Sequence, residues 1–469
     1  MNRPKSGSDK SSSLTPLAKR PKWPEIIWAS SPEPYAPRIL GLNPWIYDFA
    51  AYNLWSRPVG LLACLDMLRK AGARVALLDC LDKTWADINW PRPKSYGQGH
   101  YPKVNLPRPS LLVHVPRNYS RYGLPLQAVA QALARLSPPP DLVLVTSIMT
   151  YWYPGVVTAI RMIRKTWPHV PIVLGGIYAS LCFEHAQCLD VDLVIKGPLE
   201  NQNNWQSLWH LLDISPPPLP KHAGLSLAMD LYPETNFAPI LGSRGCPFHC
   251  AYCASNKLFS GFRQKEADLV FEETYAQFQR GTRDFAFYDD ALLVNPDKWL
   301  WPFLELIHKK GLRLRLHTPN AMHIRYLSQD VCHKLKKAGL TTIRLGLESA
   351  DFQNRLDAKL TEEEWQRGIK NILRAGFNSK DIAAYILFGL PGQKDEEIEL
   401  AIKKVKEWGI RPELAYYTPI PGSKLFSKAQ EHSPYPLDEP LFQNNSIWPC
   451  VPGGFSWEKQ KKWKEIIKD

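Results

Sequence analysis

Short apolar runs without alternating polar positions recur in the first half of the chain, and segments with apolar residues at helical spacing separate them. After Pro58, for example, Leu61, Leu65 and Leu68 fall on one face of a helix, and Gly72 stands where that helix should end. Such apolar runs are typical of parallel strands that are buried on both faces of a sheet. We therefore expect an α/β domain with a doubly wound, Rossmann-like parallel sheet, whose ligands lie beyond the carboxyl ends of the strands. The predicted strands are 38–43, 74–79, 142–147, 171–176 and 193–197.

A second series of alternating strands and helices fills most of the C-terminal half of the chain. Six strand–helix units are too many for a small flavodoxin-like sheet, but they fit a partial (β/α)6 barrel. The predicted strands of this barrel are 239–243, 285–290, 312–318, 341–348, 383–390 and 413–419. The predicted helices between them include 265–279, 297–310, 328–338, 362–375 and 395–408.

Segments rich in Pro, Ser and Lys divide the chain into domains. Within the first folded domain, residues 84–123 read as an irregular, Pro-rich insertion. The predicted divisions are a disordered basic tail (1–37), a Rossmann-like domain (38–213), a Pro-rich linker (214–238), a barrel (239–428) and a C-terminal extension (429–469).

The composition limits the class of protein. Of 469 residues, 45% are hydrophobic and 22% are charged, which excludes a wholly disordered chain. No run approaches the roughly 18 apolar residues of a membrane-spanning helix, and the N-terminus lacks the apolar core of a signal peptide. Nine thinly spread cysteines do not suggest a secreted disulfide framework, so we expect a cytoplasmic protein with no membrane partner. The net charge of +13 lies partly in the tail, and no recognition module accompanies it, so nucleic acid is not an expected partner.

Three cysteines with the spacing C-x₃-C-x₂-C, namely Cys246, Cys250 and Cys253, directly follow a predicted strand. Their soft sulfur ligands suit zinc or an iron–sulfur cluster. Structural zinc takes four ligands, but no second cysteine pair is present, and the ring of His249 would point away in most loop geometries. Three ligands and an open fourth position favour a 4Fe–4S cluster with one bare iron. A zinc loop or three core cysteines are the alternatives.

This motif, with the aromatic Tyr252 before its last cysteine, resembles the radical S-adenosylmethionine (radical SAM) superfamily. The later strand-end motifs match the family in order over roughly residues 239–425. The resemblance implies that the bare iron binds the amino and carboxylate groups of S-adenosylmethionine. It also implies that one electron from the cluster breaks a carbon–sulfur bond to give a 5′-deoxyadenosyl radical, which abstracts hydrogen from a substrate. A flavodoxin- or ferredoxin-like electron donor is then an expected partner.

Two strand ends carry carboxylates that could bind S-adenosylmethionine. Asp289 and Asp290 end the second barrel strand, where carboxylates can accept hydrogen bonds from an ammonium group; a solvated turn or a helix cap is the structural alternative. Glu348 ends the fourth strand, where an unpaired carboxylate is costly, so a ribose hydroxyl or Arg344 is its expected partner.

Other strand-end residues are implied by the resemblance as cofactor contacts. Gly389 permits close backbone approach to an adenine, or only a tight turn, and Tyr252 could pack beside the adenine or fill its loop. Asn320 and Ser349 end the third and fourth strands. No residue is singled out as catalytic.

The order of elements in residues 38–200 is similar to the cobalamin-binding domain that precedes many radical SAM barrels. The resemblance implies corrin contacts from strand-end loops that contain Asn43, Ser147, Gly175 and Gly176. The D-x-H-x-x-G motif that supplies a cobalt ligand is absent, and neither His114 nor His169 lies near a predicted strand end. A Rossmann-like scaffold without the cofactor is therefore the alternative. The six cysteines outside the motif have no ligand spacing and are expected to be buried thiols.

Together these features predict a radical SAM enzyme with a 4Fe–4S cluster, S-adenosylmethionine and cobalamin, which transfers a methyl group. One alternative is a cobalamin-independent radical oxidoreductase or a methylthiotransferase-like enzyme, although the chain shows neither a second cysteine cluster nor an RNA-binding module. Another is a non-catalytic iron–sulfur or corrinoid sensor. The sequence leaves open whether the substrate is a small molecule or a biopolymer.

Overall fold

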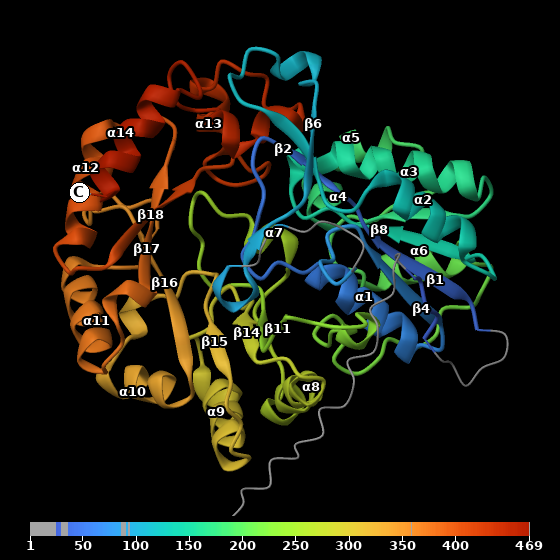
Figure 1. Cartoon of the computed structure of the whole chain (residues 1–469), viewed down its shortest axis with the longest axis horizontal. Helices are drawn as coiled ribbons and strands as arrows, with labels where there is room; N and C mark the ends of the chain where they lie inside the picture. Colours follow the sequence, from blue (N-terminus) through green and yellow to red (C-terminus); the bar gives the residue numbers. More distant parts are fainter. Residues whose placement is uncertain (1–24, 30–35, 86–90, 92–93, 358, 469) are drawn as a thin grey trace, which may run out of the picture.

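The computed structural model describes residues 25–29, 36–85, 91, 94–357 and 359–468 (Figure 1). The predicted disordered tail lies largely outside the described residues. None of the helices in these described ranges combines the length and the apolar character that a bilayer crossing requires.

The first domain is built on a five-stranded parallel sheet, the N-terminal sheet, in the order β10-β9-β8-β1-β4. Residues of α1 (Val59–Lys70) and α6 (Gln202–His210) pack on one face, while those of α2 (Leu126–Arg135) and α3 (Tyr153–Thr166) pack on the other. The order changes direction between β1 and β8, so this is the topological switch point where open α/β sheets bind ligands. The strands are β1 (Arg38–Asn43), β4 (Arg74–Asp79), β8 (Leu142–Val145), β9 (Ile172–Leu174) and β10 (Leu193–Val194).

The segment predicted to be an irregular insertion contributes the strands β5, β6 and β7 to two small antiparallel sheets. One joins β2 (Ile46–Asp48), β7 (Tyr119–Tyr122) and β6 (Lys103–Leu106), and the other joins β3 (Tyr52–Asn53) to β5 (Gly99–His100). The prediction of irregular structure was therefore wrong in part, because these short strands pair with segments far away in the sequence.

The second domain is built on a six-stranded sheet, the C-terminal sheet, whose strands are parallel and follow one another in chain order. The predicted α/β class is confirmed, and the sheet is open, with β11 and β18 at its edges. In Figure 1 the helices lie outside the curved sheet. The strands are β11 (Phe237–Ile240), β14 (Asp284–Phe287), β15 (Arg315–His317), β16 (Leu340–Glu348), β17 (Ile382–Phe388) and β18 (Arg411–Tyr416). The helices are α8 (Ala267–Gln279), α9 (Leu300–Lys309), α10 (Gln329–Lys337), α11 (Glu362–Arg374) and α12 (Asp395–Lys406).

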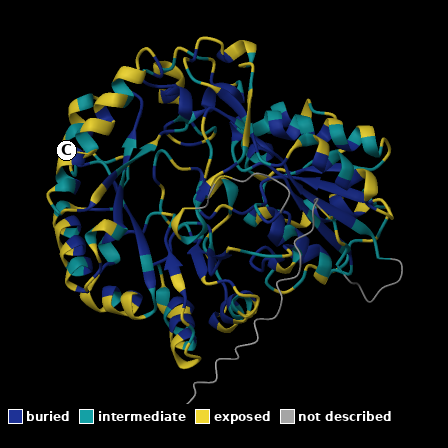
Figure 2. Cartoon of the chain, viewed as in Figure 1, coloured by how far each residue is buried: buried dark blue, intermediate teal, exposed yellow. Residues whose placement is uncertain are grey.

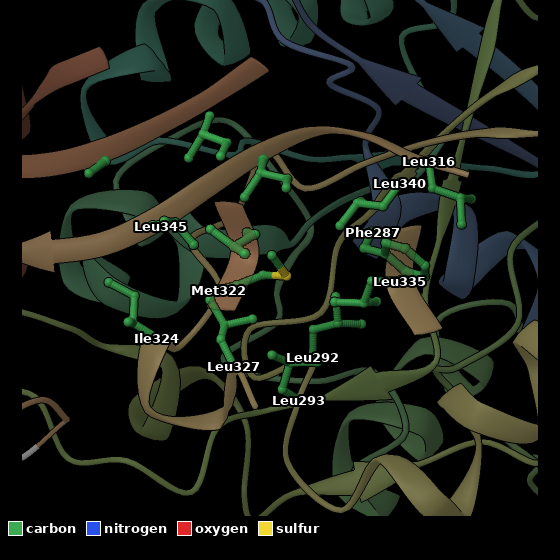
Figure 3. Packing of buried hydrophobic residues seen from close by; sticks show 14 of the residues in the cluster. Phe287, Leu292, Leu293, Leu316, Met322, Ile324, Leu327, Leu335, Leu340 and Leu345 are labelled. Carbon is green, nitrogen blue, oxygen red and sulfur yellow. The ribbon is translucent and has the colours of Figure 1, made fainter. Parts of the chain in front are cut away.

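Side chains alternate along the strands of the C-terminal sheet. Phe287 and Leu316 point into a core that also contains Leu335 of α10 (Figure 3). Ala286, from the opposite face of β14, packs with Trp55 of the first domain. The helix-facing side of the sheet is thus apolar. The inner side faces the N-terminal domain and the strand-end loops, where polar chemistry can be placed.

The C-terminal extension connects the two domains. Asn444 donates a hydrogen bond to Asp48 of β2 at 2.9 Å, and residues of α13 (Phe426–His432) share one apolar cluster with Tyr119 of β7. These contacts are buried (Figure 2), so the extension fixes how the two sheets face each other.

Candidate active site

The three cysteines lie on the loop 245–254, here called the cluster loop, which follows the short strand β12 (Ser243–Arg244). Two other strand-end loops hold it by backbone hydrogen bonds: the amide of Ala251 donates to Leu356 at 3.0 Å, and the amide of Leu425 donates to Ala251 at 2.9 Å. Tyr252 donates from its hydroxyl to Asp357 at 2.8 Å. The loop is therefore positioned from both sides before any cofactor binds.

The backbone around the cluster loop favours charged sulfur. The Ser255 amide donates a hydrogen bond to the sulfur of Cys253 at 3.4 Å; burial raises the pKa of Cys250, and the positive charge of Lys359 lowers it. Both interactions favour a thiolate, although burial raises the pKa of the Cys246 thiol to about 11.

The donor set fits a cubane cluster. No three His, Cys, Asp or Glu residues in the described part of the chain lie close enough to share one metal ion, whereas a 4Fe–4S cluster takes one thiolate per iron. His249 is turned toward α7 (Ser255–Leu258), where its Nδ1 lies 2.8 Å from the amide of Asn256. The three cysteines would hold three irons and leave the fourth free.

Asp289 is buried beneath the cluster loop, with only 3% of its surface exposed. It accepts hydrogen bonds from the Ser243 hydroxyl at 2.5 Å and the Gly242 amide at 3.4 Å. Burial raises the pKa of Asp289 to about 7, although the hydrogen bonds from Ser243 and Gly242 stabilise the carboxylate and lower the pKa. Asp289 thus braces the chain that leads into the cluster loop, and the neighbouring Asp290, which accepts a hydrogen bond from Ser255, is the carboxylate nearer the cysteines.

Replacing Asp289 by Asn should remove part of the pH dependence of stability. Because the folded-state pKa is about 7 and the ordinary value is 3.8, the folded protein binds this proton more tightly than the unfolded chain. This stabilisation is complete below about pH 4 and is lost as the pH rises through 7, with a loss of about 2–3 kcal/mol between pH 5 and pH 8. Urea unfolding at pH 5 and pH 8 should show that the free energy of unfolding falls less between these pH values in Asp289→Asn than in the wild type. Equal losses would contradict this assignment.

Glu348 lies at the end of β16, where the ladder with β17 is interrupted and the φ angle of Glu348 is 63°. Residues other than glycine rarely adopt this left-handed conformation, which often marks a functional position. Burial raises the pKa of Glu348 to about 7, and Lys359 is the strongest opposing influence. Arg344, its expected structural partner, instead places Nε 3.1 Å from Glu413 of β18.

The remaining predicted contacts are spread around the same strand ends. Asn320 is exposed and donates its side-chain amide to the Tyr288 carbonyl at 3.0 Å. Ser349 accepts the Asp351 amide at 3.1 Å on its hydroxyl. Gly389 has a φ of 84° and lies against Val451 of the C-terminal extension.

A large cavity opens at the switch point of the N-terminal sheet and reaches the C-terminal domain. Its empty volume is about 1090 Å³, part of it open to solvent, and its lining is mainly apolar. Ser147, Gly175 and Gly176, which are predicted contacts, line it together with Tyr288, which follows β14 of the C-terminal domain. Asn43 does not line it, because its amide donates to Asp79 of β4 at 2.7 Å.

The cavity has the features of a site for a large, flat cofactor. Gly60, Gly175 and Gly197 line it, and a Cβ added to any of them would meet no atom within 4 Å, so a ligand can approach the backbone there. The predominantly apolar wall suits a corrin ring. No histidine is found among the described residues that line the cavity, so the residues present fit a corrin without a protein histidine on cobalt.

Two residues of the site carry no motif in the sequence. Lys359 lies on the loop after β16, and Arg244 forms an ion pair with Glu200 at 2.8 Å. Arg57, which lines the cavity from the turn before α1, opens the segment 57–62, which is part of the resemblance to the cobalamin-binding domain. Only the position of Arg244 directly before the cluster loop could have drawn attention to it.

Comparison with known proteins agrees with this geometry. Residues 240–405 match the family model of the radical SAM superfamily. The chain contains a radical SAM domain. It is 23% identical over 325 residues to an uncharacterised methyltransferase of Pyrococcus horikoshii, an alignment that covers 62% of this chain and 69% of that protein. It is 22% identical over 284 residues to the bacteriochlorophyllide d C-12(1)-methyltransferase of Chlorobaculum tepidum, an alignment that covers 55% of this chain and 60% of that protein. The chain thus spans less than two thirds of the second relative.

A solved structure shares the fold of both domains. The radical S-adenosylmethionine methyltransferase TsrM from Kitasatospora setae, with cobalamin and a [4Fe–4S] cluster bound, matches with a TM-score of 0.61 and 15% identity. The match covers 86% of this chain and 76% of that one. The radical SAM domain implies a 4Fe–4S cluster and S-adenosylmethionine as cofactors, and the protein is a radical SAM enzyme related to methyltransferases.

Proposed function

We propose that this enzyme transfers a methyl group from S-adenosylmethionine to an organic acceptor and that cobalamin, bound in the switch-point cavity, takes part. The observation that carries the proposal is the position of the cavity, which is lined by Gly60 and Gly175 of the first domain and by Arg244, Phe259 and Tyr288 of the second. A corrin held there would face the side of the molecule that carries the cluster loop.

The relatives support this proposal. Two of them are named as methyltransferases, and the TsrM structure of the same fold holds both cobalamin and a [4Fe–4S] cluster. The apolar lining and the open glycines of the cavity are the features in this chain that fit such a cofactor.

The chain's own residues would divide the work at the site. Cys246, Cys250 and Cys253 would hold the cluster. Asp290, whose charge acts on Cys246, and Glu348, whose charge acts on Tyr252 of the cluster loop, are the carboxylates available for the ammonium or ribose of S-adenosylmethionine. The cluster supplies electrons one at a time when bound, and a flavodoxin- or ferredoxin-like protein would supply them in turn. The interface between the domains would keep water from the reacting groups.

Cobalamin binding can be tested at Gly60, in the first turn of α1. Gly60→Trp should place an indole in the open space and weaken cobalamin binding at least tenfold, because the ring and the corrin would compete for one volume. Gly60→Ala adds only a methyl group and should keep binding. Hydroxocobalamin is added to each anaerobically reconstituted protein. The corrinoid absorbance should then comigrate with the wild type and with Gly60→Ala, but not with Gly60→Trp.

Methyl transfer has its own readout in the same preparations. Loss of the methyl group converts S-adenosylmethionine to S-adenosylhomocysteine, whereas reductive cleavage alone gives 5′-deoxyadenosine. With reductant and cobalamin, wild-type protein should form S-adenosylhomocysteine, and Gly60→Trp should not. Formation of 5′-deoxyadenosine alone would indicate a cobalamin-independent radical enzyme, and formation of neither product would indicate a sensor.

A further inference from the structure

A single glutamate of the first domain holds both arms of the hairpin that carries the cluster loop. β12 pairs antiparallel with β13 (Arg263–Gln264) to form this hairpin, here called the cluster hairpin (residues 243–264), and Arg244 lies opposite Arg263 at its base. Oε1 of Glu200 accepts a hydrogen bond from Arg244 at 2.8 Å and one from Arg263 at 2.7 Å. In the described part of the chain, no other carboxylate lies within 4 Å of either arginine. These three residues, here called the glutamate bridge, therefore join the two domains where the cluster hairpin begins and ends.

The linker between the domains covers the glutamate bridge. The side chains of Glu200 and Arg244 are only 12% and 14% exposed. The carbonyl of Gly224 accepts a further hydrogen bond from Arg244 at 2.9 Å. Gly224 has a φ of 77°, and a Cβ added to it would lie 2.5 Å from Oε1 of Glu200, so this close approach requires glycine. Because water screens such a covered ion pair less than an exposed one, the loss of either partner is costly.

The glutamate bridge also connects two parts of the wall of the switch-point cavity. Gly197, three residues before Glu200, lines the cavity, and its amide donates to the Ser180 hydroxyl at 3.0 Å. Arg244 and Phe259 line the cavity from the cluster hairpin, and the Arg244 guanidinium lies 4.3 Å from the centre of the Phe259 ring. A ligand in the cavity would thus meet residues from both sides of the bridge.

Order in the cluster loop and order in the cavity wall are linked by this arrangement. The three cysteines lie between Arg244 and Phe259 in the sequence, so a cluster that fixes the loop also restrains both of these wall residues. A ligand binds more tightly to a wall that is already fixed, because less of the binding free energy is spent on ordering that wall. The effect must be reciprocal, since coupling between two sites acts equally in both directions.

We propose that Glu200 is a positioning residue that couples the switch-point cavity to the cluster loop, so that cobalamin binds more tightly when the cluster is present. The inference rests on the proposed function, because it needs both cofactors. Glu200 holds the cluster hairpin against the cavity-lining segment 197–199. Its negative charge, which two arginines share, is the property that the coupling requires.

The test measures the dissociation constant of hydroxocobalamin under anaerobic conditions for two preparations of each full-length protein, one reconstituted with the cluster and one freed of iron by a chelator. In the wild type the cluster should lower this constant about tenfold, which is within the usual range of coupling between sites. Glu200→Gln keeps the shape of the side chain but removes its charge, and the cluster should then change the constant less than about twofold. A merely structural role would weaken binding equally in both preparations and leave the ratio of the two constants unchanged.

The matched control is Asp192→Asn. Asp192 also pairs with an arginine, Arg164 at 2.8 Å, but it lies directly before β10, at the opposite end of the strand from the cavity. This variant removes one carboxylate from the first domain, as Glu200→Gln does, and should keep the ratio of the wild type.

The outcomes separate this inference from the proposed function. Wild-type protein that binds no hydroxocobalamin in either preparation would defeat the cobalamin part of the proposed function and this inference with it. Equal constants with and without the cluster in the wild type would overturn the coupling alone, and an unchanged ratio in Glu200→Gln would overturn the role of Glu200. Should Glu200→Gln not fold, Arg263→Met, which removes the more exposed arginine of the bridge, provides the comparison: a ratio below that of the wild type supports the coupling and an unchanged ratio refutes it.

Discussion

Replacing Cys250 by Ala should abolish the iron–sulfur cluster and, with it, all cleavage of S-adenosylmethionine. Cys250 is the buried member of the three cysteines. Two thiolates cannot hold the cluster that three would hold, because each thiolate binds one iron. Anaerobically reconstituted wild type should contain about four irons per chain, whereas the variant should be almost colourless and should release no 5′-deoxyadenosine.

The matched control is Cys188→Ala. Cys188 is exposed and lies in the first domain, where its thiol donates a hydrogen bond to the carbonyl of Glu184 at 3.4 Å. This variant should bind iron and cleave S-adenosylmethionine like the wild type. Unchanged iron content in Cys250→Ala, or zinc in the purified wild type, would refute the cluster assignment.

Sequence reasoning located the sheets well because their strands are defined by local pattern. The strands Arg38–Asn43 and Arg74–Asp79 have the predicted bounds, since an uninterrupted apolar run is visible without any knowledge of its neighbours. The strand predicted at 285–290 instead ends at Phe287. Tyr288 and Asp289 leave the ladder because the side chain of Tyr288 is held by the first domain and that of Asp289 by Ser243 of β12, which sequence periodicity cannot show.

The candidate site was predictable where its residues are contiguous. Cys246, Cys250 and Cys253 form a motif that stands out in the sequence, whereas the partner of Glu348 depends on how two loops fold over each other. Arg344 was the expected partner because it is close in sequence, yet it pairs across the sheet with Glu413. Long-range pairs of charges are set by tertiary packing rather than by local propensity.

Arg57 offers the largest expected effect on stability. Its guanidinium lies 3.2 Å from Asp82 and 3.8 Å from Asp79, and 4.0 Å from the centre of the Tyr232 ring. The side chains of Arg57 and both aspartates are about 95% buried or more. A buried cation is costly alone, but removing it leaves two buried carboxylates with neutral hydrogen-bond donors and no cation beside them. The guanidinium also joins the turn before α1 to the segment that enters the second domain.

Arg57→Met should therefore lower the free energy of unfolding by about 3–5 kcal/mol, measured by urea unfolding followed by tryptophan fluorescence. Much of this loss should return in the variant Arg57→Met/Asp82→Asn, because one uncompensated carboxylate is then neutral. The control is Arg69→Met, which breaks a more exposed pair with Asp230 and one with Asp66, which keeps Lys70 as a partner, and should cost less than about 1 kcal/mol. If both arginine variants cost the same, the buried network does not stabilise the contact between the cavity wall and the second domain, and that contact must then depend on apolar packing alone.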